Sequence, residues 1–271
     1  MKSLCLPCAL LGSALLLGTT QAHAFDLIPT TENSFQLGAG VGLLPDYIGD
    51  QEYQFVFIPA IKGAWSHDKF GTVALGYGAH GGLSWSPVHF TYGELALVAS
   101  ATPGRHDSDH GLFGSDYLKG MGKIEDTPEL GLRGSAILLP WLTLHSQLMW
   151  GLGNSGHQGA WGDLGLEAST HLSESLEGSF DISSSWGSSD YMQSFYGVTS
   201  EQAQNSRFHT YSAGSGIKDV TLSAGLRYHF TPSMSLEGHV GMISLQGDAA
   251  DSPIVRERNN LMSNLLFMYR F

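Results

Sequence analysis

Two short polar stretches contain the residue types that could carry out chemistry. In the first, Asn154-Ser155-Gly156-His157, a hydroxyl and an imidazole stand two positions apart, which is the start of an acyl-transfer site. Such a site also needs the base within hydrogen-bond reach of the nucleophile and oriented by a third group, which this spacing does not supply. We therefore expect a glycine-rich loop with no catalytic residue. A lipid-modifying enzyme that uses Ser155 and His157 is the alternative.

The second stretch, Arg105-His106-Asp107-Ser108-Asp109-His110, holds two histidines and two aspartates. Imidazole and carboxylate groups bind divalent metals, so this stretch could hold an ion. No cysteine joins them, and spacing alone is a weak signal for a metal site. The pattern is more typical of a solvated polar loop, and we expect neither a metal nor another cofactor.

The N-terminus predicts export from the cytoplasm. Lys2 is followed by an apolar run over residues 4–18 and by Ala22-His23-Ala24, which together are the pattern of a secretory signal peptide cut before Phe25. We therefore expect residues 1–24 to be a signal peptide and residues 25–271 to form a single domain.

Composition excludes several classes of protein. Gly accounts for 35 of the 271 residues, and charged residues for 14%, which is low for an ordinary exported enzyme. The formal charge of −12 becomes −13 when Lys2 leaves with the signal, so nothing favours a nucleic-acid partner. Cys5 and Cys8 leave too, which excludes disulfides and a lipid-anchoring cysteine in the mature chain. No mature apolar run is long enough for a membrane-spanning helix.

Alternation of apolar and polar residues predicts β-strands, most clearly in the second half. One face of the segment 220–230 carries Val220, Leu222, Ala224, Leu226, Tyr228 and Phe230. The same period of two recurs over residues 129–138, 142–150, 163–172, 176–186 and 234–242. Few charges, many glycines and this repeated alternation predict a transmembrane antiparallel up-and-down β-barrel, although a soluble barrel gives the same alternation with its apolar face inward.

Three features favour the membrane barrel. The apolar phase of these strands contains no Lys or Arg, as lipid contact requires. Aromatic residues gather at strand ends, where interfacial girdles form: Trp141, Trp186, Tyr228, Phe230, Tyr269 and Phe271. The chain ends on the stripe Phe267, Tyr269 and Phe271, which resembles the C-terminal signal that barrel-assembly machinery reads in bacterial outer-membrane proteins. We therefore expect contacts with that machinery and with outer-membrane lipid.

Connections of two lengths predict the orientation and the strand count. Short turns at 139–140, 172–175 and 231–232 alternate with longer polar connections at 101–127, 152–160, 188–218 and 246–259. Outer-membrane barrels place short turns in the periplasm and long loops outside. Candidate strands at 34–43, 53–65, 70–80 and 88–100 precede seven more, and this total of eleven breaks the even-number rule. One early segment is therefore split or does not cross fully, and we favour about ten strands, with twelve as the alternative.

Charged side chains fall on the polar phase, which should face the lumen. They are Glu129, Arg133, Asp163, Glu167, Glu177, Asp181, Arg227, His229, Glu237 and His239. Charges in a closed lumen need partners, and ten or twelve strands give a narrow bore. We favour a filled, hydrogen-bonded interior over a small hydrated pore.

Eight segments, taken in order, carry a resemblance to a known family. They are GVGLLPDYIGDQEY (40–53), FIPAIKG (57–63), GRHDSD (104–109), LKGMGKIEDTPELG (118–131), GHQG (156–159), SFYGVTSEQA (194–203), YSAGSGIKDV (211–220) and LQGDAADSPIV (245–255). The series resembles the MltA-interacting protein (MipA/OmpV) family over nearly the whole mature chain. Residues that match its motifs are Tyr47, Gly49, Asp50, Arg105, Gly156, His157, Gly197, Val198, Gly247, Asp248, Asp251 and Pro253.

The resemblance implies an outer-membrane β-barrel of a Gram-negative cell with a scaffold role. Founding members of the family bind a murein-degrading lytic transglycosylase and a bifunctional penicillin-binding protein. Other members resemble porin-like or osmotic and stress-responsive proteins, so a narrow channel is the alternative function. The family supplies no catalytic residue to carry over. Because most of the matched residues fall in the long connections, binding surfaces are expected on loops or on the periplasmic rim.

Overall fold

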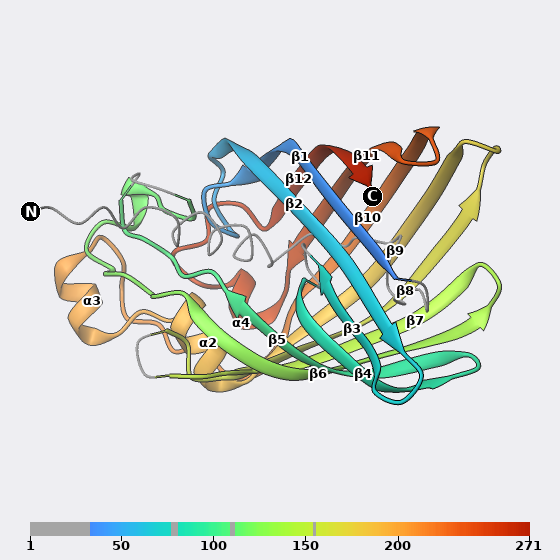
Figure 1. Cartoon of the computed structure of the whole chain (residues 1–271). Coiled ribbons are helices and arrows are strands. Elements are labelled where there is room, and N and C mark those ends of the chain that lie inside the picture. The colour runs from blue at the N-terminus through green and yellow to red at the C-terminus, as the bar shows by residue number, and fades with distance from the viewer. Residues whose placement is uncertain (1–32, 77–80, 109–111, 154–155) are drawn as a thin grey trace, which may run out of the picture.

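A computed structural model describes residues 33–76, 81–108, 112–153 and 156–271. In this part of the chain, twelve strands form a closed antiparallel barrel in which neighbours follow chain order and β12 pairs with β1 (Figure 1). The strands are β1 (Ser34–Pro45), β2 (Tyr53–His67), β3 (Gly71–Gly76), β4 (Gly82–Phe90), β5 (Gly93–Thr102), β6 (Thr127–Leu139), β7 (Leu142–Gly151), β8 (Ala160–His171), β9 (Leu176–Gly187), β10 (Gly216–Thr231), β11 (Met234–Leu245) and β12 (Asn259–Arg270). The barrel therefore has twelve strands, the alternative to the favoured count of about ten.

The early third of the chain explains why the count is twelve and not eleven. The candidate segment 88–100 is split, because it contains the end of β4, the turn at Thr91 and Tyr92, and most of β5. The candidate 70–80 shortens to β3, which has only six residues. Pro87 and the positive φ of Gly82 lie within β4, whose register with β5 shifts between Trp85 and Val88. This local irregularity hides β4 from a search for alternation.

The two faces of the wall follow the alternation. Outward side chains are apolar and exposed, as Leu226 and Tyr228 on β10 illustrate, whereas the lumen-facing side chains of Glu237 and Asp181 are buried. Strands that are polar on one face and apolar on the other suit a barrel whose outer face meets lipid. None of the described helices is long and apolar enough to cross a membrane.

The C-terminal stripe lies on the outer face of the closing seam. Phe267, Tyr269 and Phe271 are all exposed. The backbone N–H of Phe271 donates to the carbonyl of Phe35 at 3.0 Å, and their ring centroids are 5.7 Å apart. The last residue is thus bound to the first strand rather than frayed. A role of the stripe as an assembly signal stays a prediction.

Glycines on β1 form a corner of the barrel. Gly38, Gly40 and Gly42 share one face of β1, and a Cβ at Gly40 would lie 2.0 Å from the backbone oxygen of Leu265 on β12. A Cβ at Gly42 would lie 2.8 Å from Cδ1 of Ile58 on β2. Side chains of β2 and β12 therefore close over β1. We call the resulting cluster the apolar corner; it contains Leu44, Val56, Ile58, Ala60, Ile243, Met262, Leu266 and Met268, with Ile48 and Phe113 packed against it.

The rest of the lumen wall is polar, and its charged groups contact one another. Near the short turns, Glu237 accepts from Lys62 at 3.1 Å and from Arg227 at 3.0 Å, and Arg227 also reaches Glu177 at 3.4 Å. Farther along the barrel, His145 Nε2 lies 2.7 Å from Asp181 Oδ2. The polar phase thus lies inward and is paired, as the alternation predicts.

The two ends of the barrel differ. At one end, the turn end, the connections are short. At the other, the loop end, the long connections carry α2 (Ser189–Tyr196), α3 (Ser200–Asn205), α4 (Gly247–Ala250) and the short 3-10 helix η1 (Asp116–Leu118) (Figure 1). Ser188 caps the N-terminus of α2, where its side chain accepts from the Tyr191 N–H, and Thr199 caps α3 in a capping box with Gln202. Helices this short are marginally stable by themselves, so the caps contribute to their stability.

Candidate functional site in the loop cap

The long connections at the loop end pack together into what we call the loop cap. It comprises the described residues of 46–52, 103–126, 152–159, 188–215 and 246–258. Two buried clusters join these connections, one around Tyr47, Leu118 and Val198 and the other around Met192, Tyr196 and Ala249. All twelve residues that match the family motifs lie in the loop cap, so the structure brings together positions that are spread over most of the chain.

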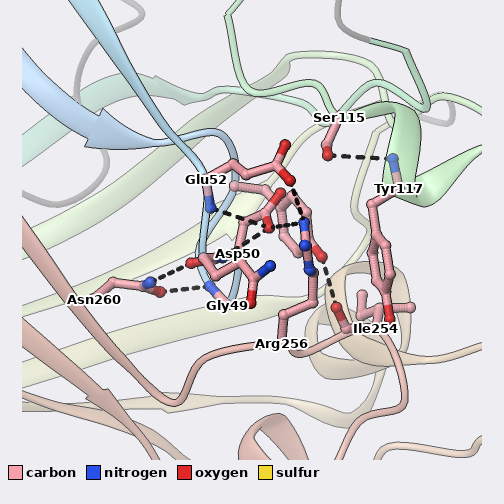
Figure 2. A network of polar contacts seen from close by, with 10 residues as sticks. Gly49, Asp50, Glu52, Ser115, Tyr117, Ile254, Arg256 and Asn260 are labelled. Carbon is pink, nitrogen blue, oxygen red and sulfur yellow. Dashed lines mark hydrogen bonds and ion pairs between the residues drawn. The ribbon is translucent and has the colours of Figure 1, made fainter.

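Asp50 and Arg256 form its central ion pair (Figure 2). The Asp50 side chain is 0% exposed, and its Oδ1 lies 2.9 Å from Nη1 of Arg256. The same Nη1 lies 3.0 Å from Glu52 Oε1, while Asn260 donates to the backbone oxygen of Asp50 at 2.6 Å. A buried carboxylate needs such partners to stay charged. The pair therefore ties the β1–β2 connection to the β11–β12 connection.

Gly49 makes the turn that presents Asp50. Its φ of +107° is a conformation that other residues rarely adopt. Its N–H donates to Asn260 Oδ1 at 2.6 Å, and its carbonyl accepts from the N–H groups of Arg256 and Glu257 at 2.7 and 3.0 Å. A Cβ here would also meet Val255 at 2.9 Å. Both the backbone angle and the close approach thus require glycine.

Two tyrosines extend this contact. Tyr47 donates its hydroxyl to the carbonyl of Ile254 at 2.6 Å, and burial, with a further contribution from the charge of Asp50, raises the pKa of its phenol. The guanidinium groups of Arg256 and Arg207 lie 4.5 and 4.8 Å from the ring centroid of Tyr117, in η1. Cation–π contacts of this kind stabilise the outer layer of the loop cap.

His157 is a structural residue in this geometry. Its side chain is 0% exposed, and its Nε2 lies 2.8 Å from Glu129 Oε1, which also accepts from Trp161 Nε1 at 2.7 Å. The ring packs against Tyr191 and Phe195 of α2. A substrate could reach this imidazole only if the packing opened. Ser155, the other member of the pair, lies outside the described residues.

Gly156 holds His157 close to the barrel wall. A Cβ at Gly156 would lie 1.9 Å from Oγ1 of Thr127, the same hydroxyl that accepts from the His157 N–H at 3.0 Å. The backbone therefore approaches β6 more closely than any other residue type permits. Close packing against Thr127 explains why position 156 is glycine, and no catalytic role is needed to explain it.

Arg105 is buried among the connections without a carboxylate within ion-pair distance in the described part of the chain. Its Nη1 donates to the carbonyl of Phe195. Burial lowers the pKa of Arg105 to about 10, and the neighbouring phenols of Tyr47 and Tyr196 oppose this shift. This cation therefore joins the 103–126 connection to the C-terminal turn of α2.

The remaining motif residues shape the connections around α2 and α4. Gly197 ends α2, where a Cβ would lie 2.0 Å from the side chain of Gln193. Val198 exchanges backbone hydrogen bonds with Tyr211 at 2.8 and 2.9 Å, and the hydroxyl of Tyr211 donates to the carbonyl of Asp248. Asp248 also accepts from the Gly214 N–H at 2.6 Å.

Three motif residues have smaller roles in this geometry. Gly247 begins α4 with a φ of +49°. Asp251 pairs with Arg258 at 2.8 Å on the surface, where both side chains are mostly exposed. Pro253 is half-buried and directly precedes the buried Ile254. These residues turn the chain back toward β12 and do not enter the central contacts.

No group of three or more metal-ligating side chains in the described residues is arranged to hold an ion. In the histidine- and aspartate-rich stretch, Asp107 accepts from the N–H groups of Gly120 and Gly122 at 3.2 and 3.1 Å, which closes a turn. Asp109 and His110 lie outside the described residues.

The sequence did not single out Arg256 and Asn260, which hold Asp50 and Gly49. Both follow the last matched segment, 245–255, by five positions or fewer, and adjacency to that segment is the only signal. Their role depends on contacts about two hundred positions away along the chain, such as the 206 positions between Arg256 and Asp50. Pairs of this kind cannot be identified from one sequence.

Comparisons with known proteins give a family and several barrels. Residues 37–271 match the family model described as MltA-interacting protein MipA. The chain is similar to a KdgM porin (9% identity, TM-score 0.44, 87% of this chain and 99% of that chain). A second similar structure is the COG4313 outer membrane channel from Pseudomonas putida F1 (12% identity, TM-score 0.42, 93% of this chain and 100% of that chain). The chain is also similar to the CymD monoaromatic hydrocarbon channel, with 9% identity, a TM-score of 0.42 and coverage of 94% of each chain. No curated protein matches the chain.

Proposed function

Because the chain belongs to the MltA-interacting protein MipA family, we propose that it is a non-enzymatic outer-membrane scaffold that links a murein hydrolase to a murein synthase. The hydrolase is a lytic transglycosylase and the synthase a bifunctional penicillin-binding protein. The observation that carries the proposal is the family match over residues 37–271, nearly the whole mature chain. The packing of His157, which is buried against Glu129 and two aromatic rings, supports a role without catalysis.

The partners would dock at the turn end. Murein lies in the periplasm, and outer-membrane barrels direct their short turns to that side. The turns are too short to form a binding domain, so the contact surface consists of the rim and of residues 25–33, which precede β1. The rim presents mixed charge from Asp68, Lys69, Glu174 and Arg270, all of which are exposed.

Crosslinking in intact cells tests the scaffold. A tagged version is crosslinked and recovered from the outer membrane, and the attached proteins are identified by mass spectrometry. We expect enrichment of a lytic transglycosylase or a penicillin-binding protein over a control barrel of equal abundance. Recovery of assembly factors and lipopolysaccharide alone would reject the scaffold.

Deletion of residues 25–33 tests where the partner docks. We expect the deletion to abolish partner capture while the barrel still assembles, because no strand residue is removed. As a control, Glu201→Lys changes an exposed residue of α3 at the opposite end and should leave capture intact. Capture by the deletion variant at the level of the unaltered protein would remove residues 25–33 as the docking site.

A narrow channel is the second candidate function, and the polar lumen wall favours it. Paired charges such as Lys62 and Glu237 line the lumen. Single-channel recording in planar bilayers discriminates between the two functions. Discrete conductance steps from purified protein would support the channel, and a silent bilayer with protein shown to be inserted would exclude it.

A further inference from the structure

Arg105 is a buried cation with unused hydrogen-bonding capacity. Its side chain is 5% exposed, and its backbone is held in the 103–126 connection by paired hydrogen bonds to Ile124. The side chain reaches α2, where Nη1 donates to the carbonyl of Phe195. Its Nε is also buried, but has no hydrogen-bond partner in the described part of the chain. A guanidinium carries several N–H donors, and a single carbonyl does not satisfy them.

The charge of Arg105 is compensated only in part. Phe195 belongs to the last turn of α2, and carbonyls at the C-terminus of a helix together carry about half of an elementary negative charge. Among the described residues, no carboxylate lies within ion-pair distance of the guanidinium, and none contributes to its pKa. This is notable in a chain with 25 acidic and 13 basic residues. A counter-charge for Arg105 is therefore missing from the described residues.

A second donor lies beside this cation. Tyr196, the last residue of α2, is 5% exposed, and each of the two side chains affects the pKa of the other. Burial raises the pKa of the Tyr196 phenol, and the charges of Lys218 and Arg105 oppose the rise. The phenol thus stays protonated and able to donate. Its hydroxyl has no hydrogen-bond partner in the part of the chain that the structure describes.

The barrel wall brings another cation to Tyr196. The register between β9 and β10 shifts at Lys218, and both Lys218 and Asp219 are buried, so this bulge turns two consecutive side chains inward. Nζ of Lys218 lies 2.9 Å from Asp219 Oδ2, which compensates its charge. Two cations and one carboxylate therefore influence Tyr196, and the uncompensated charge is that of Arg105.

We propose that Arg105 and Tyr196 form a binding site for a small oxyanion, either phosphate or a carboxylate, within the loop cap. Guanidinium and phenol groups both donate, and oxyanions are the acceptors that a guanidinium binds best. A buried charge that lacks a counter-charge is strongly destabilising, so a bound anion would offset this cost. Because both side chains are buried among the connections, away from the lipid-facing wall, the ligand is a dissolved anion and not a lipid headgroup.

Hydrogen exchange of the unaltered protein tests the site. The purified barrel is folded in an uncharged detergent, and exchange of the α2 amides is measured in sodium chloride, sodium phosphate and sodium acetate at equal ionic strength. At about ten times its dissociation constant, a bound oxyanion should slow exchange through local opening about tenfold. A stronger effect of phosphate would identify a tetrahedral ligand, and a stronger effect of acetate a carboxylate. Equal exchange in the three salts would overturn the proposal.

Matched variants separate an anion site from a structural arginine. Arg207→Met, which replaces an exposed arginine of the loop cap, should keep the full response to oxyanions. Arg105→Met should abolish the response. In chloride it should change exchange less than about threefold, because the lost hydrogen bond is offset by removal of an uncompensated charge. Tyr196→Phe removes only the hydroxyl and should weaken the affinity about tenfold.

Two results with Arg105→Met would overturn the proposal. One is an oxyanion response as large as that of the unaltered protein. The other is faster exchange by the same factor in all three salts, which would show that Arg105 only holds α2 in place. Heat-modifiable mobility on a denaturing gel verifies that each variant is folded, and the salt comparison on the unaltered protein provides the result if one is not.

Discussion

At the scale of single residues, one arginine carries the central ion pair of the loop cap. Arg256 is the ion-pair partner of Asp50, whose side chain has no access to water. Removing one partner of a buried pair leaves an uncompensated charge, which costs much more than the pair itself contributes. The surface pair between Arg258 and Asp251 has no such consequence, because water solvates both groups when they separate.

Arg256→Met is therefore expected to weaken the loop cap, by about 3 kcal/mol in the free energy of local opening. Hydrogen exchange of the backbone amides in residues 46–52 and 246–258 measures this opening. Arg258→Met is the matched control and should leave exchange unchanged. Equal exchange in the two variants would mean that Asp50 gains no stability from Arg256.

His157→Ala separates a structural histidine from a catalytic one. The variant leaves Glu129 with Trp161 as its remaining partner, so the 152–159 connection should loosen by about 2 kcal/mol. Limited proteolysis of the folded protein measures the loosening. The lipid profile of the cell should be unchanged, as it should be for His209→Ala, which replaces an exposed histidine of the loop cap. A lipid profile altered by His157→Ala alone would restore the enzyme hypothesis.

The residues of the loop cap show which part of a site can be predicted from one sequence. The motifs placed Tyr47, Gly49 and Asp50 in a connection, and the glycine signalled an unusual turn. The partners Arg256 and Asn260 could not be assigned, because a loop residue has no periodicity that relates it to another loop. Contacts between neighbouring strands can be predicted from alternation and register. Contacts between connections become apparent only when the closed barrel brings the connections together.

At the scale of the elements, alternation predicted the second half of the barrel, placed β3 within a longer segment and missed β4. Strands β6 to β12 each have ten residues or more, which is enough for the period of two to be visible. Strand β3 has six, and β4 contains Pro87 and a register shift. The error in the strand count thus has one structural cause, the irregular strand β4.

Strand β1 requires glycine at the corner of the barrel. Gly40→Ala places a Cβ within 2.0 Å of the Leu265 carbonyl oxygen, which is backbone and cannot rotate away. We expect loss of at least about 3 kcal/mol of stability, the upper end of overpacking costs, and a smaller folded fraction in the outer membrane. Heat-modifiable mobility measures that fraction. The control is Gly238→Ala on β11, where the nearest atom to a Cβ is Leu265 Cδ1 at 3.6 Å. Equal folded fractions would show that β1 can shift to accept a side chain.

At the scale of the whole molecule, the two ends serve different purposes. The loop end is closed over by helices and buried contacts, whereas the turn end presents short turns and a rim of mixed charge. The scaffold needs the turn end in the periplasm, and that orientation rests on the general rule for outer-membrane barrels. It is therefore the premise that should be tested before any partner is sought.

Two exposed glutamates, one at each end of the barrel, test the orientation. Glu201→Cys lies on α3 at the loop end and Glu174→Cys in the β8–β9 turn, and residues 25–271 contain no other thiol. A membrane-impermeant maleimide should label position 201 in intact cells, and position 174 only after the outer membrane is permeabilised. The reverse pattern would place the loop cap in the periplasm. The buried contacts around Asp50 and His157 would then shape the surface available to a murein enzyme, and the search for partners would move from residues 25–33 to the loop cap.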